Sequence, residues 1–267
     1  MSGQQRSHEP ALPGPIGFPV RRVSLDAPWE WLAAGWRDMC AAPALSLGYG
    51  AAFTVAAWLI VTTLARLGAA AVIPVVAAGF VLIAPLLASG LYEMSRRLET
   101  GEKVTLAAVL SGIRPAVHRL MFFGVALFLG FFAWVELAFL LLSLFLGEVA
   151  LPDPSQFVHT ALFTNAGLAL LFAGTITGGI LAAMVFCISS IAAPLLLAKD
   201  IDTVTAMATS VRAVSLNIGP MALWAGIIAG YMTIGLVTLF FGLIFIFPLL
   251  GHATWHAFRA LTVIDSV

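Results

Sequence analysis

Residues 120–146 read LMFFGVALFLGFFAWVELAFLLLSLFL, an apolar run in which Glu136 is the one charged residue. A bilayer core of about 30 Å is crossed by about 20 apolar residues in an α-helix, so this run is long enough to cross it. Backbone amides in hydrocarbon need internal partners, and the run lacks the two-residue alternation of a membrane β-barrel. The stretch therefore predicts a transmembrane helix in an all-α protein.

Four further apolar stretches are at least as long as a bilayer requires: residues 44–64, 70–92, 166–198 and 219–257. The stretch 166–198 is longer than one crossing needs, so we expect it to tilt, kink or protrude. The last stretch fits two crossings with a turn at Gly235, and the alternative is one helix kinked at Pro248. Two crossings return Arg259 to the side of the other basic segments, which gives a polytopic bundle of six transmembrane helices.

The basic residues divide unevenly between the two sides of this topology. Of 13 Lys and Arg residues, Arg66 alone lies on one side and the other twelve lie on the opposite side. Segments rich in Lys and Arg stay in the cytoplasm. We therefore expect a multi-pass protein of the bacterial inner (plasma) membrane, with both termini cytoplasmic.

The composition excludes a soluble domain. Hydrophobic residues make up 61% of the chain and charged residues 10%, too few to cover a soluble surface. The formal net charge is zero, which gives no field to attract nucleic acid. Residues 1–22 are rich in Pro and Gly and predict a disordered cytoplasmic tail ahead of a single membrane domain over residues 23–262.

Three polar stretches between the apolar runs carry helical patterns: residues 24–40, 105–114 and 203–212. The first contains Trp29, Trp31 and Trp36, with Arg37 beside them. Indole rings prefer the headgroup layer, where the ring and its N–H are both accommodated. We expect each stretch to form an amphipathic helix on the cytoplasmic interface, with these four residues anchoring the first.

These helices begin three internal repeats, over about residues 24–98, 105–198 and 203–261. Each unit is an interfacial helix followed by a helical hairpin, and each hairpin ends in Pro-Leu-Leu, at residues 85–87, 194–196 and 248–250. We expect each proline to kink the second helix of its hairpin near the cytoplasmic end. The alternative is coincidence among Leu-rich membrane helices.

Glu136 is the strongest candidate for a functional residue. A carboxylate at membrane depth costs about 2.5–3.5 kcal/mol on insertion scales and often marks an ion path or proton relay. It could couple transport to a proton or cation. The alternative is a carboxyl that faces the outer headgroups or is protonated against a neighbouring helix.

His252 and His256 are four residues apart and share one face of a helix, a spacing that can present two nitrogens to a metal. No third ligand lies nearby in the sequence, so interfacial polar residues are the favoured interpretation. Cys40 and Cys187 predict no disulfide. The motifs of metalloproteases, serine hydrolases and nucleotide-binding loops are missing from the sequence, which predicts no enzyme and no cofactor.

The motif Trp29-x-Trp31-Leu32-x-x-Gly35-Trp36-Arg37-Asp38 precedes a hairpin that ends in Arg96-Arg97-Leu98-Glu99-x-Gly101. On these residues the chain resembles, over about residues 20–262, a bacterial family of integral membrane proteins of unknown function. The resemblance implies a helical membrane protein and carries no functional residues over. Some members are labelled cytochrome c oxidase subunits, but haem–copper oxidases need several intramembrane histidines, and none of the five histidines here adjoins another.

Three hypotheses about function follow. The favoured one is a non-enzymatic accessory or scaffold protein, with the lipid bilayer and a membrane protein, such as a respiratory complex, as partners. The alternative is a small solute or ion transporter or channel that uses Glu136. The least favoured is a haem-binding or metal-binding respiratory component that uses His252 and His256.

Overall fold

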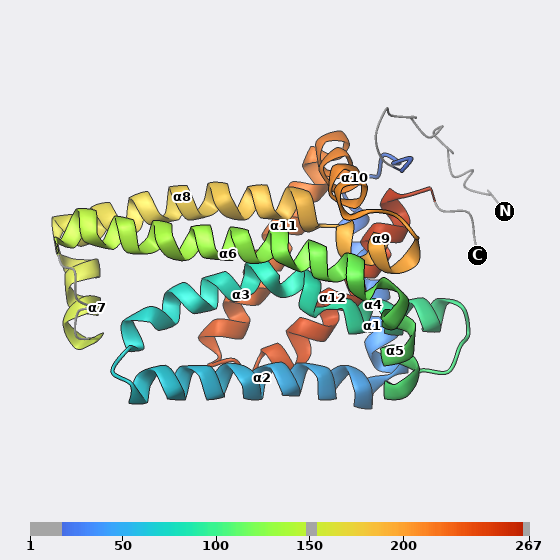
Figure 1. The fold of residues 1–267 in the computed structure, drawn as a ribbon, viewed down its shortest axis with the longest axis horizontal. Coiled ribbons are helices and arrows are strands. Elements are labelled where there is room, and N and C mark those ends of the chain that lie inside the picture. Colours follow the sequence, from blue (N-terminus) through green and yellow to red (C-terminus); the bar gives the residue numbers. More distant parts are fainter. Residues whose placement is uncertain (1–17, 148–153, 264–267) are drawn as a thin grey trace.

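A computed structural model of the chain describes residues 18–147 and 154–263. Regular structure in these residues is helical, apart from an isolated bridge between Val20 and Thr262. The elements are α1 (Ala27–Ala41), α2 (Pro43–Arg66), η1 (Ala70–Val72), α3 (Ile73–Leu87), α4 (Ser89–Glu99), α5 (Leu106–Ile113), η2 (Arg114–Ala116), α6 (Val117–Leu146), α7 (Pro154–Phe163), α8 (Asn165–Ser189), α9 (Ala192–Ala198), α10 (Thr203–Leu216), α11 (Ile218–Val237) and α12 (Leu243–Leu261). Figure 1 shows an elongated bundle in which α2, α3, α6 and α8 run along the long axis.

Within the described residues, five helical segments are long and apolar enough to cross a membrane: Pro43–Arg66, Ile73–Glu99, Leu106–Leu146, Asn165–Ala198 and Ile218–Val237. The sixth crossing that the sequence predicts, on α12, is not among them. The second half of α12 carries His252, His256 and Arg259, which lower its mean hydropathy. The structure thus gives five candidate spans where we expected six.

The last apolar stretch forms two helices, α11 and α12, and not one helix kinked at Pro248. The turn lies at residues 238–242, beyond the predicted position at Gly235, which stays inside α11. Leu239 and Phe240 form this turn with left-handed φ angles of 53° and 69°. The turn contacts α2, where the hydroxyl of Thr54 donates to the Phe240 carbonyl at 3.2 Å.

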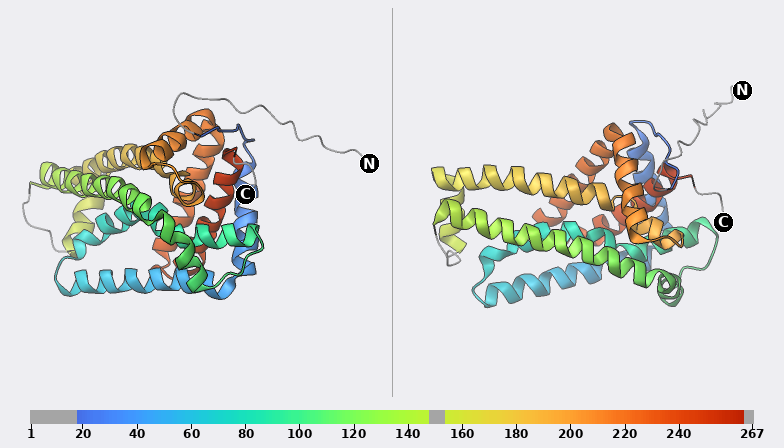
Figure 2. Two further views of the ribbon diagram at one scale, coloured as in Figure 1. Left: turned by 45° about the vertical axis from the view of Figure 1, so that its right-hand side comes forward. Right: turned by 45° about the horizontal axis from the view of Figure 1, so that its top comes forward.

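The α11–α12 hairpin is shorter than its neighbours. The turn residue Phe241 packs on Trp58, with ring centroids 5.9 Å apart. Trp58 lies eight residues before Arg66 ends α2, so the hairpin stops about 12 Å short of the end of α2. Figure 2 shows the same difference in two further views, where α11 and α12 end before the tips of the other long helices.

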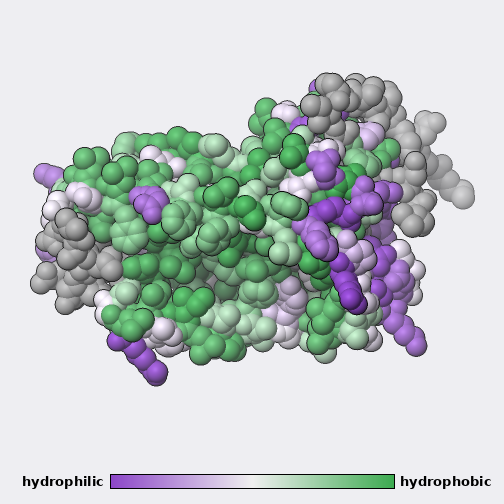
Figure 3. All heavy atoms as spheres, viewed as in Figure 1, coloured by the Kyte–Doolittle hydropathy of each residue, from purple (hydrophilic) through white to green (hydrophobic). Residues whose placement is uncertain are grey.

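Charge and hydrophobicity separate along the long axis. Hydrophilic residues gather at one end, which we call the charged end and which contains α1, α4, α5, α9, α10 and the second half of α12 (Figure 3). The rest of the molecule, the apolar body, has a mostly hydrophobic surface and ends at what we call the far end. Such a surface suits hydrocarbon along the body and water or headgroups at the charged end.

Both ends of the described chain lie together at the charged end. The amide of Arg21 donates to the Leu261 carbonyl at 2.8 Å, and the amide of Val263 donates to the Pro19 carbonyl at 3.1 Å. The disordered tail that we predict over residues 1–22 therefore ends too late, because residues 19–21 pair with the end of α12. Residues 1–17 lie outside the described residues.

The hairpin ends meet in the core of the charged end. The chain breaks its helix at Ala88, after Pro85, and at residues 190–191, before Pro194, whereas α12 continues through Pro248. The resulting segments α4, α9 and α12 contact one another pairwise. Each is also covered by an interfacial helix: α5 packs on α4, α10 on α9 and α1 on α12. The core of this end is fully buried and includes Leu91, Leu195 and Phe258.

A proline and a glycine allow α2 to pack closely on α12. Pro248 has no N–H, so the carbonyl of Ile244 loses its partner inside the helix. Gly50 of α2 lies directly on this carbonyl, and a Cβ atom at position 50 would overlap the Ile244 backbone. The absence of a side chain at Gly50 is therefore required for the crossing of these two helices.

Candidate functional site

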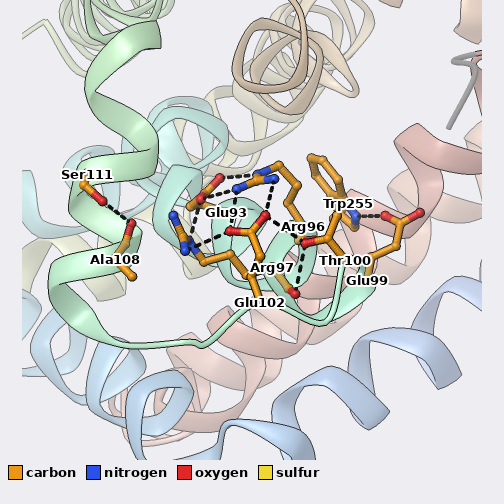
Figure 4. Close-up of polar contacts among 9 residues, drawn as sticks. All are labelled: Glu93, Arg96, Arg97, Glu99, Thr100, Glu102, Ala108, Ser111 and Trp255. Carbon is orange, nitrogen blue, oxygen red and sulfur yellow. Dashed lines mark hydrogen bonds and ion pairs between the residues drawn. The ribbon is translucent and has the colours of Figure 1, made fainter. Parts of the chain in front are cut away.

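The most concentrated set of charged side chains surrounds Glu93 on α4 (Figure 4). Arg96 and Arg97 follow Glu93 by three and four residues, so one turn of helix brings all three together. Glu93 is 1% exposed, and its carboxylate accepts hydrogen bonds from Arg96 Nε at 2.7 Å and from Arg97 Nε at 2.7 Å. This buried carboxylate is therefore compensated by two guanidinium groups.

Glu102 completes this cluster from the loop after α4. Its carboxylate lies 3.2 Å from Arg96 Nη1 and 3.0 Å from Arg97 Nη1. Hydrogen bonds from Arg96 and from the Thr100 hydroxyl lower the pKa of Glu102. Two carboxylates thus balance two guanidinium groups, so the cluster fixes the α4–α5 connection and leaves no net charge to attract an ion.

Glu99 links α4 to α12. Its carboxylate accepts hydrogen bonds from Trp255 Nε1 at 2.9 Å and from Arg259 Nε at 2.9 Å. Both partners belong to the half of α12 that lowers its hydropathy. The polar residues of α12 are therefore used to hold α4.

The two candidate metal ligands on α12 have separate partners. His252 Nε2 lies 2.9 Å from Ser46 Oγ, and His252 Nδ1 lies 2.7 Å from Ser95 Oγ. His256 Nε2 donates to Asp38 Oδ2 at 2.8 Å. The histidines share a face, as their spacing predicts, but their nitrogens join α12 to α1, α2 and α4. In the described part of the chain, no group of three or more His, Cys, Asp or Glu is arranged to hold a metal ion.

Asp38 connects these contacts into one polar chain. Burial acts to raise the pKa of Asp38, but hydrogen bonds from His256 and Ser95 and the charge of the neighbouring imidazoles lower it on balance. The pair of Ser46 and His252 has the composition of an activated nucleophile, yet both side chains are fully buried. A substrate cannot reach them in this conformation, so the chain is suited to positioning helices.

Glu136 lies on the exposed surface of α6. It makes no ion pair or hydrogen bond with any described residue, and it does not line the cavities of about 460, 350 and 130 Å³ between the described helices. Nearby, Trp134 faces inward and its Nε1 donates to the Val75 carbonyl of α3 at 3.1 Å. The coupling role of Glu136 stays a prediction.

The predicted anchors of α1 divide into two groups. Trp29 and Trp36 are each 54% exposed and Arg37 is exposed, so these side chains are available to headgroups or to a partner. Trp31 is 3% exposed and packs edge-to-face on Trp224 of α11, with centroids 5.6 Å apart. The expectation that Trp31 anchors in the interface is therefore wrong, because its ring belongs to the core.

Two cavities lie in the apolar body. One, of about 460 Å³, lies between α3, α6 and α8. The other, of about 350 Å³, lies between α2, α3 and the α11–α12 hairpin, and every residue that lines it is apolar. Neither is lined by a charged residue. These spaces suit apolar groups and offer no ligands to a hydrated ion.

The described fold is that of a helical integral membrane protein, with charged side chains gathered at one end of apolar helices. Residues 72–198 match the model of a family described as predicted integral membrane protein (DUF2189), a domain of unknown function. This segment contains the whole of the second predicted repeat and the second helix of the first. No curated protein and no solved structure matches the chain.

The sequence analysis missed the cluster at Glu93, although the sequence contains a signal for it. A carboxylate followed by arginines at the third and fourth positions, at the end of an apolar run, is the pattern of a paired charge on one helix face. The contacts of Glu99 with α12 and of Asp38 with His256 join residues more than 150 positions apart. Spacing within one helix gives no signal for such pairs.

Proposed function

We propose that the protein is a non-enzymatic accessory or scaffold protein of the bacterial inner membrane. The observation that carries this proposal is that polar side chains at the charged end form hydrogen bonds and ion pairs with one another. Acidic and basic side chains on α1, α4 and α12 bond to one another, and the buried Ser46–His252 pair joins α2 to α12. This construction supports a rigid platform, whereas a catalytic site needs polar groups that face a substrate.

The proposed topology has six crossings in three hairpins, each preceded by an interfacial helix. The pairing of Val20 with Thr262 supports it, because chain ends that lie together require an even number of crossings. Helix α12 is then the sixth and shortest crossing, and its apolar first half pairs with α11. The excess of basic residues at the charged end supports cytoplasmic termini.

The proposed contact surface is the outer face of α1. Trp29 and Trp36 lie seven residues apart, so they share the exposed face, and Arg37 lies beside them. Aromatic and Arg side chains dominate the energetics of protein interfaces. A membrane-embedded partner, such as a respiratory complex, would meet this face at the level of the headgroups.

Site-directed photocrosslinking in native membranes tests this proposal. A photoreactive amino acid at Trp29 or at Trp36 should give one defined protein adduct. The same amino acid at buried Trp31 is the matched control and should give none, provided that the variant folds. If the three positions give equal adducts, or if Trp29 and Trp36 give lipid adducts alone, the scaffold proposal is wrong.

A second candidate function, a small transporter or channel, is supported by Glu136, whose carboxylate lies within a candidate span and has no partner among the described residues. Protein reconstituted in vesicles should then carry a proton or cation flux that Glu136→Gln abolishes. Under the accessory function, both proteins give the background flux. Haem or metal binding through His252 and His256 is the least favoured, and a Soret band or stoichiometric metal in the purified protein would establish it.

A further inference from the structure

We propose that the space between α2 and α3 is a binding site for a phospholipid, with an acyl chain in the groove and the phosphate beside Arg66. This inference goes beyond the accessory function, since it needs only that the protein is embedded in a bilayer. It commits to one occupant, a phospholipid from the leaflet that meets the far end.

The groove exists because α2 and α3 pack on other helices. They are joined by a short connection over residues 67–72, yet α2 packs mainly on α12 and α3 mainly on α6. One face of α2 is left for the groove, and its residues recur at helical spacing: Phe53, Ala56, Ala57, Ile60, Val61 and Leu64. A matching face of α3 forms the opposite wall. Phe131 of α6 and three residues of the α11–α12 hairpin complete the lining: Leu236, Phe240 and Leu243.

The chemistry of the lining selects an apolar occupant. All the residues that line the groove are apolar, and its volume is about 350 Å³. A buried water needs two to four polar partners, so water does not fill such a space stably. An apolar cavity of about 150 Å³ holds a benzene molecule, so this groove accommodates about a dozen carbon atoms in a chain.

The size of the groove argues against a helix from a partner. A helix is at least about 10 Å wide, so 15 Å of it occupies on the order of 1,200 Å³. The end of the groove toward the charged end is closed, because the Tyr49 hydroxyl donates to the Leu87 carbonyl at 2.6 Å. The groove therefore takes a single flexible chain.

Arg66 supplies the charge that a phospholipid needs. It is exposed in the last turn of α2, two residues after Leu64, and it bonds to no described residue. A guanidinium group binds phosphate oxygens in a bidentate manner. The larger cavity between α3, α6 and α8 has no such partner, because residues 120–198 contain no Lys or Arg.

The test uses the full chain in vesicles of phosphatidylethanolamine and phosphatidylglycerol. The probe is phosphatidylglycerol with a photoreactive diazirine midway along one acyl chain. We expect adducts on the facing walls of α2 and α3. Ala57→Phe should lower their yield about tenfold, the effect of losing contact with about two methylene groups. Ala52→Phe, on the exposed face of the same helix, is the matched control and should leave the yield unchanged.

Two further variants distinguish a loss of lipid binding from misfolding, and the contribution of the acyl chain from that of the headgroup. Ala77→Phe fills the groove from α3 and should reproduce the loss at an unchanged unfolding temperature. Arg66→Gln should lower labelling by phosphatidylglycerol about threefold and leave unchanged the labelling by a diacylglycerol with the same chain. Adducts spread evenly around α2, equal losses in Ala57→Phe and Ala52→Phe, or an adduct with another protein chain in the groove would each overturn the proposal.

Discussion

The charged end and the apolar body are built on different principles. At the charged end, Leu195 and Phe258 are fully buried, and charged side chains such as Glu93 are paired inside the protein. In the body, large apolar side chains such as Phe122 and Phe172 are mostly exposed, and cavities separate neighbouring helices. The comparison indicates that protein contacts hold the charged end together, while lipid completes the packing of the body.

This difference follows from the solvent at each place. Burying an apolar side chain gives little free energy when the alternative is hydrocarbon, so helices in a bilayer associate mainly through close packing and hydrogen bonds. At the charged end the surrounding solvent is water, so the hydrophobic effect stabilises a compact core there. Substitutions in the two regions should therefore differ in their cost.

The largest expected effect is at Glu93. Glu93→Gln removes the charge that compensates Arg96 and Arg97 and should lower the free energy of unfolding by about 3 kcal/mol. Thermal unfolding of the detergent-purified protein, followed by circular dichroism, measures the change. Glu102→Gln, at the exposed rim of the same cluster, should give a much smaller change. Equal effects would show that burial at the charged end does not set the cost.

The second prediction compares one leucine from each region. Leu195→Ala, in the core of the charged end, should cost about 3 kcal/mol because it leaves a cavity. Leu129→Ala, which is 63% exposed on the body, should stay within about 0.5 kcal/mol. Unfolding in the same detergent measures both. A similar loss for both variants would contradict the proposed division.

The third prediction concerns the crossing of α2 and α12. Gly50→Ala should cost about 2 kcal/mol, because the new methyl group overlaps the Ile244 backbone. Gly48→Ala on the same helix meets open space and should gain about 0.5 kcal/mol. The two unfolding temperatures should therefore shift in opposite directions. A gain for Gly50→Ala would mean that this crossing is loose.

The smallest expected effect depends on pH. The pKa of Asp38 is lowered in the folded protein, so its carboxylate stabilises the fold fully above the unfolded value near 3.8 and less as the pH falls through the lower folded value. Asp38→Asn should cost about 1 kcal/mol at pH 6. The gap between the wild type and this variant should shrink below about pH 4. A gap that grows on acidification would contradict this assignment.

Much of the fold follows from the sequence. Each of the five candidate spans overlaps one of the predicted apolar runs, because hydrocarbon leaves the α-helix as the available backbone structure. The polar stretches predicted as helices overlap α1, α5 and α10. The amphipathic role of these helices, the three repeats and the six crossings stay predictions. Each interfacial helix covers the end of one hairpin: α5 covers α4, α10 covers α9 and α1 covers α12. This repeated arrangement supports the three repeats.

Other features depend on contacts that local patterns do not contain. The turn forms at Leu239 and Phe240 and not at Gly235, because Thr54 and Trp58 of a distant helix hold it there. For Trp31 the sequence does carry a usable signal. Trp29 and Trp36 are seven residues apart and share a face, whereas Trp31 is two residues from Trp29 and points to the opposite face. Helical periodicity thus separates the core tryptophan from the two exposed ones.

The packing of α1 against α12 has a consequence for biogenesis. Among the described helices, α1 packs most extensively on α12, which follows it more than 200 residues later in the chain. The inner face of α1 therefore lacks its main cover until α12 has been synthesised. A nascent chain truncated before α12 would therefore present a surface that quality-control proteases can recognise as incompletely folded.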